Sequence, residues 1–240
     1  MPARNGVTAA TMVASGFTGV EDVFSGERGF FHAHEQFAQP EQFVAGLGLS
    51  FDIMQTAIKR WPVGYPIQAP LDALANIMAA HHITAKDIER VAVTIDEQGA
   101  KTVNARKMAS INVQHLMAMM LIDGEITFAS SHDAARVNDP AVLAVKRRIE
   151  LSGSRELSRA KTTQAIVEVT TRDGERLRYH TKAVRGSATN PMVREDVAVK
   201  SRDLLAPALG KGRAETLIET IWNIERVKDV RALRRLLRPA

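Results

Sequence analysis

The pattern of hydrophobic and polar positions predicts helices at the beginning of the chain, a middle part of helices and strands, and helices again at the end. A helical stretch is expected near Gly6 to Ser15, with short glycine-punctuated pieces after it up to residue 50. Trp61 precedes Pro62, and residues before proline avoid the helical region, so residues 53–62 are predicted to be an extended approach to a turn. A helix with Pro70 at its first position follows.

The middle of the chain carries strand and helix signals in alternation. Val91 to Ile95 is predicted to be a strand. Residues 108–123 are apolar nearly all round after Gln114 and stop at Gly124, which predicts a buried helix with a glycine at its end. Asp139 and Pro140 predict the cap and first residue of another helix, which reaches about residue 148.

A hairpin is predicted around Asp173 and Gly174, because apolar and polar residues alternate on both sides of this pair. A two-residue turn would place Val169 opposite a charged residue, Arg178. A three-residue loop over residues 172–174 places Val169 opposite Leu177 and aligns the two apolar faces. The three-residue loop is therefore expected, with Glu168 opposite Arg178 on the solvated face.

The remainder of the chain is predicted to be helical. Asn190 and Pro191 are expected to open one that Pro207 and Gly210 end, and two amphipathic helices follow, over residues 217–224 and 230–237. The fold class predicted from this order is α+β and mostly helical.

Composition and charge exclude several classes of protein. The 240 residues are 45% hydrophobic and 25% charged, which is typical of a globular chain, and no apolar run is long enough to cross a bilayer. The absence of cysteine removes thiol nucleophiles and thiolate metal sites and suits a reducing compartment, so a cytoplasmic location is expected. The net charge is +5, but no nucleic-acid-binding signature is present, and neither nucleic acid nor membrane is an expected partner.

Motifs of common active sites are missing from the sequence. It contains no Walker loop, nucleophile elbow or dinucleotide fingerprint. His32, His34, His81 and His82 have spacings that could hold a metal, but no carboxylate completes a site, and no metal centre is predicted.

The order of several segments resembles the carboxy-terminal half of the MmgE/PrpD family, which includes 2-methylcitrate dehydratase and cis-aconitate decarboxylase. The resemblance spans nearly every residue, and six segments in family order carry it. They are ARNGVTAATMVASGFTGVEDVFSGERGFF, KRWP leading into PLDALANI, LMAMMLIDGEITF, NDPAVLAVKRRIEL, TRDGERL and GSATNPMVREDVAVKSRDLL.

The resemblance implies a mostly helical domain, incomplete relative to the family, with an inserted smaller α/β lid domain. Residues 1–54 would be a segment of the helical domain, residues 55–187 the lid, and residues 188–240 helices that return to the helical domain. It also implies a lyase, either a dehydratase or a decarboxylase, that acts on a small polycarboxylate and needs no cofactor. The chain would be a carboxy-terminal portion or one subunit of a split enzyme.

The family's active-site lysine in the K-R-aromatic-Pro turn matches Lys59. The resemblance makes Lys59 and His115 the candidate catalytic residues, although other members place a tyrosine at the position of His115. Arg60 and Gln68 are the candidate substrate-binding residues of the same loop. The sequence departs from decarboxylase-like members at Gly64 and Gln68, where those members place histidines, and the upstream pocket residues of the family have no counterpart here.

Elimination from a polycarboxylate needs fixed cations for the carboxylates and a group that moves a proton, and a lysine can serve either purpose. The alternative interpretation of Lys59 is an ordinary surface lysine, and that of His115 is a hydrogen-bonded core residue. For the whole chain, the alternatives are a non-catalytic or remnant subunit that stabilises a related enzyme, and a basic binding module. The partners expected are a polycarboxylate substrate, a subunit that supplies the amino-terminal half, and further copies in a homo- or hetero-oligomer.

Overall fold

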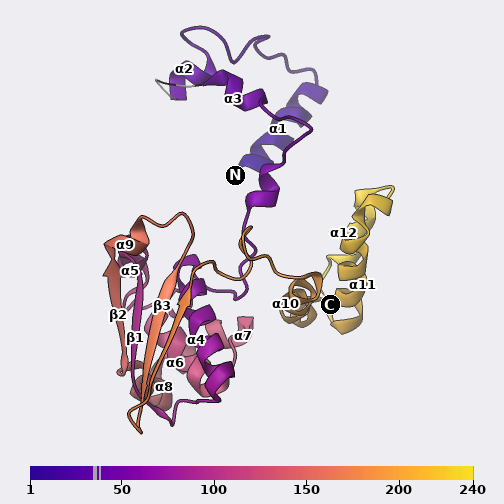
Figure 1. Ribbon diagram of the computed structural model, residues 1–240. Helices are drawn as coiled ribbons and strands as arrows, with labels where there is room; N and C mark the ends of the chain where they lie inside the picture. The colour runs from indigo at the N-terminus through magenta and orange to yellow at the C-terminus, as the bar shows by residue number, and fades with distance from the viewer. Residues whose placement is uncertain (35–36, 38, 240) are drawn as a thin grey trace. The chain divides into compact units, whose positions relative to one another are not determined.

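The computed structural model describes residues 1–34, 37 and 39–239, and the chain forms two compact units, Met1–Asp52 and Ile53–Ala240 (Figure 1). The fold is α+β and mostly helical, as predicted, with one small mixed sheet. The sheet and its covering helices lie in the second unit.

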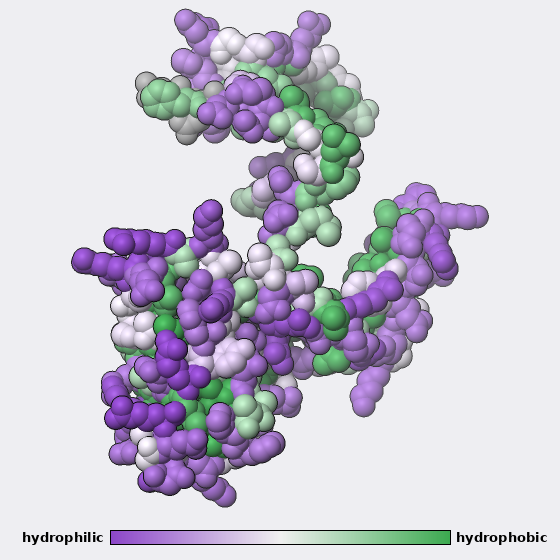
Figure 2. Space-filling view, in the orientation of Figure 1, coloured by the Kyte–Doolittle hydropathy of each residue, from purple (hydrophilic) through white to green (hydrophobic). Residues whose placement is uncertain are grey.

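The first unit consists of short helices with little interior. Its helices are α1 (Pro2–Ala14), α2 (Phe30–His34) and α3 (Pro40–Val44). Phe24, Phe30, Phe31 and Phe43 form a ring cluster with centroid separations of 5.6 to 6.2 Å. Gly29 is nevertheless the only residue that is buried among those described in this unit, and hydrophobic side chains cover much of its surface (Figure 2).

The sheet has the strand order β2-β1-β3-β4, with β1 (Ile88–Asp96) parallel to β2 (Ile149–Ser154) and antiparallel to β3 (Ala165–Thr171). The residues of one face, such as Val91, Val93 and Val167, are fully buried. The other face is solvated and carries cross-strand ion pairs between Arg90 and Glu150 and between Glu168 and Arg178.

The hairpin of β3 and β4 (Arg176–Thr181) has the predicted register. Val169 pairs with Leu177 and Glu168 with Arg178. The three-residue loop closes with a hydrogen bond of 3.0 Å from the Thr171 N–H to the Glu175 carbonyl, and Gly174 has a φ of 90°. The need to bury Val169 and Leu177 on the same face therefore fixed the loop length.

Helices α4 (Gln68–His81) and α6 (Val113–Asp123) pack on each other. Helix α4 also contacts β3 and β4, while α6 contacts α8 (Pro140–Lys146) and β2. All residues of α6 up to Leu121 are buried and Gly124 ends the helix with a φ of 80°, as predicted. Helix α4 begins at Gln68, two residues before the predicted start at Pro70. The helices of this part are α4 (Gln68–His81), α5 (Glu97–Val103), α6 (Val113–Asp123), α7 (Phe128–His132), α8 (Pro140–Lys146) and α9 (Arg155–Ser158).

The carboxy-terminal helices are α10 (Arg194–Leu209), α11 (Lys211–Trp222) and the short α12 (Leu233–Leu236). The predicted start at Asn190 is wrong, because the Asn190 amide donates to the Ala183 carbonyl at 2.9 Å and closes a turn instead. The Asp196 carboxylate accepts a hydrogen bond from the Val193 N–H and marks the true start. Pro207 lies inside α10, and Gly210 caps it.

Short 3-10 turns connect these elements. They are Asp52–Gln55, Tyr65–Ile67, Ala109–Ile111, Ala134–Asn138, Ile224–Arg226 and Val230–Ala232. The first of them replaces part of the extended segment expected over residues 53–62. The predicted return of residues 188–240 to a helical domain with residues 1–54 stays a prediction.

Candidate active site

The turn that carries Lys59 is held by its own side chains. The Lys59 ammonium donates to the Val63 carbonyl at 2.9 Å. The Gln68 amide, which is 1% exposed, accepts from the Trp61 N–H at 3.1 Å and donates to the Trp61 carbonyl at 3.0 Å. Gln68 therefore replaces the backbone partners that Trp61 would otherwise lack in the interior.

The approach to this turn is fixed by Gly186. The Ile58 N–H donates to the Gly186 carbonyl at 2.8 Å. Gly186 has a φ of 96°, and a Cβ there would lie 1.9 Å from the Ile58 carbonyl oxygen. A glycine is required at this position for both the backbone conformation and the close approach.

Arg60 lies at the surface of the turn. Its guanidinium stacks over the Trp61 ring with its carbon 4.8 Å from the ring centroid, and it reaches the Asp72 carboxylate at 3.7 Å. Burial raises the pKa of Asp72, while the charges of Arg60 and Arg185 oppose this shift. The contact with Asp72 uses only part of the Arg60 fork of five N–H donors.

Lys200 on α10 joins the site, although the sequence reasoning did not select it. Its ammonium donates a hydrogen bond to the main-chain carbonyl of Lys59. Burial lowers the pKa of Lys200, and the nearby charge of Lys59 lowers it further. The signal in the sequence was the polar series Asp196, Lys200 and Asp203, whose spacing places all three on one face of a helix.

This polar face of α10 docks on the α/β part of the second unit. The Asp196 carboxylate accepts from Arg185 at 2.7 Å, and that of Asp203 accepts from the Phe128 N–H at 2.9 Å. A cavity of about 410 Å³ lies between α10 and the turn, with Arg60, Trp61 and Lys200 among its lining residues. The predicted residue Arg60 and the unpredicted Lys200 thus face one hollow.

His115 lies in the first turn of α6, where the Asn112 side chain caps the helix by accepting from the His115 N–H at 3.0 Å. The ring is buried, and its Nε2 has no hydrogen-bond partner in the described part of the chain. Burial lowers the pKa of His115, and the charges of Lys146 and Arg136 add to this effect. The ring is therefore held neutral near pH 7.

The predicted pair Lys59 and His115 is connected only through the backbone. The Gly64 N–H donates to the Ser110 carbonyl at 2.9 Å, which brings the turn to the segment just before α6. No hydrogen bond or ion pair joins the two side chains within the described residues. Gly64 itself lies against Ile111, whose Cγ2 would be 3.2 Å from an added Cβ.

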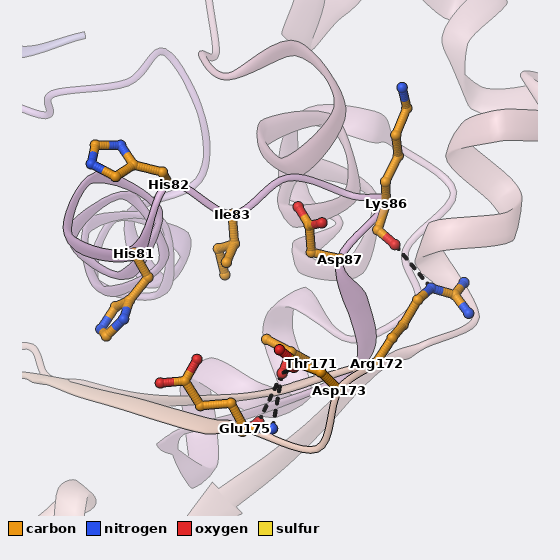
Figure 3. Close-up of a pocket in the computed structure, with 9 residues that line it drawn as sticks. All are labelled: His81, His82, Ile83, Lys86, Asp87, Thr171, Arg172, Asp173 and Glu175. Carbon is orange, nitrogen blue, oxygen red and sulfur yellow. Dashed lines mark hydrogen bonds between the residues drawn. The ribbon is translucent and has the colours of Figure 1, made fainter.

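The histidines at the end of α4 lie in another place. His81 and His82 line a cavity of about 390 Å³ together with Asp87, Asp173 and Glu175 (Figure 3). The Asp173 carboxylate accepts a hydrogen bond from the Thr171 hydroxyl, and the Asp87 carboxylate accepts one from the Thr84 N–H, whereas Glu175 bonds to Thr171 through its backbone N–H. No group of three or more His, Asp or Glu side chains with metal-binding geometry occurs in the part of the chain that the structure describes.

Comparison with known proteins gives a match to one protein family. The family model for the MmgE/PrpD C-terminal domain matches residues 61–226, more than half of the chain. The chain belongs to the MmgE/PrpD family. The match begins at Trp61, inside the turn that holds Lys59, and extends past α11.

This MmgE/PrpD chain is similar, over nearly the whole of its own length, to human cis-aconitate decarboxylase. The two are 25% identical over 249 residues, which cover 98% of this chain and 51% of the human protein. The chain therefore spans about half the length of this curated relative.

Among the described residues, no helix has the length and apolar character that crossing a membrane requires.

Proposed function

We propose that the chain contributes to a lyase that removes water or carbon dioxide from a small polycarboxylate such as 2-methylcitrate or cis-aconitate. The similarity to cis-aconitate decarboxylase across 98% of the chain carries this proposal. The cations around the turn at Lys59 support it, because a substrate with two or three carboxylates needs several fixed positive charges.

Lys59 and Arg60 would bind the carboxylates of the substrate. The Lys59 ammonium has three N–H groups, of which the bond to Val63 uses one. Arg60 can offer the part of its fork that Asp72 does not occupy. Gln68 would act by holding the turn, because both atoms of its amide already bond to the backbone of Trp61.

Lys200 would move the proton, because its lowered pKa brings its ammonium closer to the range in which a lysine exchanges protons at neutral pH.

In a decarboxylation, the C–C bond to a carboxylate breaks, carbon dioxide leaves, and an acid protonates the carbon that keeps the electron pair. In a dehydration, a base takes a C–H proton while hydroxide leaves with a second proton as water. The proposed reaction needs no metal or organic cofactor.

The reaction also needs groups from a second segment, because only Arg60 and Lys200 of the three proposed cations line the cavity beside the turn, together with the acids Glu125, Asp196 and Asp203. We propose that this segment is the amino-terminal half found in the longer relative, on the same or another polypeptide. A polypeptide covering that half is titrated against the chain with cis-aconitate and with 2-methylcitrate, and the unsaturated product is followed. The chain alone should show negligible turnover, and the mixture should turn over one of the two substrates. Robust turnover by the chain alone, or none in a mixture that forms a complex, contradicts the proposal.

The second candidate is a non-catalytic subunit that stabilises a related enzyme. The burial of His115 and the glycine at position 64 favour it, because neither offers a proton-moving group to the turn. Under this alternative, Lys59→Ala leaves the turnover of the complex unchanged, whereas removal of the chain lowers the stability of the partner. The lyase proposal predicts that Lys59→Ala abolishes turnover in an intact complex.

A further inference from the structure

A second hollow, separate from the turn at Lys59, lies beside the start of β1. It has a volume of about 630 Å³, and its walls come from the loop before β1, the ends of α6 and α8, and the residues Arg148 and Arg172. Leu121, Ile122, Ala141 and Val145 supply its apolar surface. Lys86, Arg148 and Arg172 supply its charge, and its lining contains no acid.

Two guanidinium groups are fixed at this hollow by backbone carbonyls, one in the loop before β1 and one at the first residue of β1. Arg172 donates from its Nε to the Lys86 carbonyl at 2.9 Å (Figure 3), and its own N–H donates to the Asp87 carbonyl at 2.8 Å. Arg148 donates from Nη1 to the Ile88 carbonyl at 3.0 Å. Each guanidinium has five N–H donors, so both keep donors for a ligand while one bond restricts their orientation.

The charges of these three residues are not neutralised by ion pairing. Within the described residues, Lys86, Arg148 and Arg172 form no salt bridge, whereas Arg90, Arg136 and Arg202 each do. Lys86 and Arg172 also border the neighbouring cavity, where Asp87 and Asp173 accept hydrogen bonds from threonines, and these bonds and the charge of Lys86 contribute to lowering the pKa of Asp87. Three cations around one hollow without an acid in its lining produce a local field that attracts an anion.

The apolar part of the lining determines the rest of the ligand. Leu121 and Val145 are buried side chains of α6 and α8, and Ile122 is partly exposed at the edge. A ligand pocket typically combines such a surface with a few fixed polar groups that orient the ligand. We propose that this hollow binds a small organic anion with a carboxylate or phosphate head, held by Arg148 and Arg172, and an apolar body that lies on Leu121, Ile122 and Val145. This inference does not depend on the proposed lyase activity.

The test is a titration of the full, ¹⁵N-labelled chain followed by NMR. Octanoate and octyl phosphate probe the two head groups, acetate probes the head alone, and octanol probes the apolar body alone. Octanoate or octyl phosphate should shift the amide signals of Ala85, Lys86 and Ile122 saturably. The stronger of the two ligands identifies the head group. Octanol and acetate should bind at least about tenfold more weakly, since each lacks one of the two contacts.

Variants of the arginines separate the proposed site from general attraction to a basic surface. Arg148→Gln and Arg172→Gln should each weaken binding by about tenfold or more. Arg172→Lys, which keeps the charge and loses the fork, should weaken it less. Arg159→Gln is the matched control, because Arg159 is exposed and lies outside the lining.

Signals that move only outside the hollow contradict the proposal, as does equal binding of octanol. Unchanged affinity in both Gln variants contradicts it as well. In that case, the three cations serve only to compensate the negative ends of the neighbouring helices. The NMR spectrum of each variant without ligand shows whether that variant is folded. If a Gln variant has unfolded, the Lys substitution at the same position replaces it. For the Lys variant, a partial loss of affinity supports the proposal.

Discussion

The ammonium of Lys200 donates a hydrogen bond to the main-chain carbonyl of Lys59. This bond links two residues that are 141 positions apart and attaches α10 to the turn of the candidate site. Lys200 is thus a support of the turn as well as a candidate for proton transfer.

The pH dependence of stability should reveal the burial of the Lys200 charge. The pKa of Lys200 is lower in the folded chain than in the unfolded chain, where it is near the usual value of about 10.4. Between these two pKa values the unfolded state binds more protons, so the free energy of unfolding contributed by Lys200 rises with pH. Urea unfolding from pH 7 to 10.5 should show a smaller rise in Lys200→Met than in the unchanged chain. An equal rise in both would mean that Lys200 is not buried against Lys59.

Gly186 should be far less replaceable than Gly174, although both have a positive φ of 96° and 90°. An alanine at position 174 meets nothing within 4 Å, so Gly174→Ala should cost only the backbone strain of about 1 kcal/mol. Gly186→Ala adds a clash with the Ile58 carbonyl and should cost clearly more, with displacement of the turn at Lys59. The free energies of unfolding of the two variants are compared in urea. Equal costs would contradict the close approach of Gly186 to Ile58.

Gln68 should be important for stability in spite of its position beside the candidate site. Gln68→Ala leaves the N–H and carbonyl of Trp61 without their partner and opens a cavity, and we expect a loss of about 2 to 4 kcal/mol in the free energy of unfolding. The control is Gln98→Ala, at an exposed position on α5, which should change stability by less than about 0.5 kcal/mol. A loss for Gln68→Ala no larger than that of the control would contradict the role of Gln68 in holding the turn.

His115 should make the chain sensitive to acid. Its folded-state pKa is lowered below the usual value of about 6.5, so the unfolded state takes up the proton first and stability falls as the pH drops below that value. His115→Met removes this contribution along with the unpartnered Nε2, so its stability should decline less between pH 6.5 and 5. The measurement is the urea midpoint at each pH. A steeper decline in the variant would show that the buried ring is stabilised as a cation.

The sequence predicted most of the α/β part because its signals are local and agree with one another. Alternating residues around Asp173 and Gly174 gave the hairpin register, and the apolar run before Gly124 gave the buried helix. The start of α10 was misplaced because Asn190 bonds to Ala183 instead of capping a helix. Lys59 and Arg60 could be selected from a resemblance, whereas Lys200 enters the site through a contact between distant segments that no local pattern contains.

If the turn at Lys59 binds the substrate of a lyase, kcat/KM in the complex with the amino-terminal half is the most direct measurement of its role. Lys59→Ala is compared with the exposed control Lys161→Ala, and complex formation is verified for both by size-exclusion chromatography. Loss of a fixed charge that stabilises the transition state commonly costs about 100- to 1,000-fold, so Lys59→Ala should lower kcat/KM by at least about 100-fold while Lys161→Ala leaves it unchanged. A Lys59→Ala complex with undiminished kcat/KM would contradict the account.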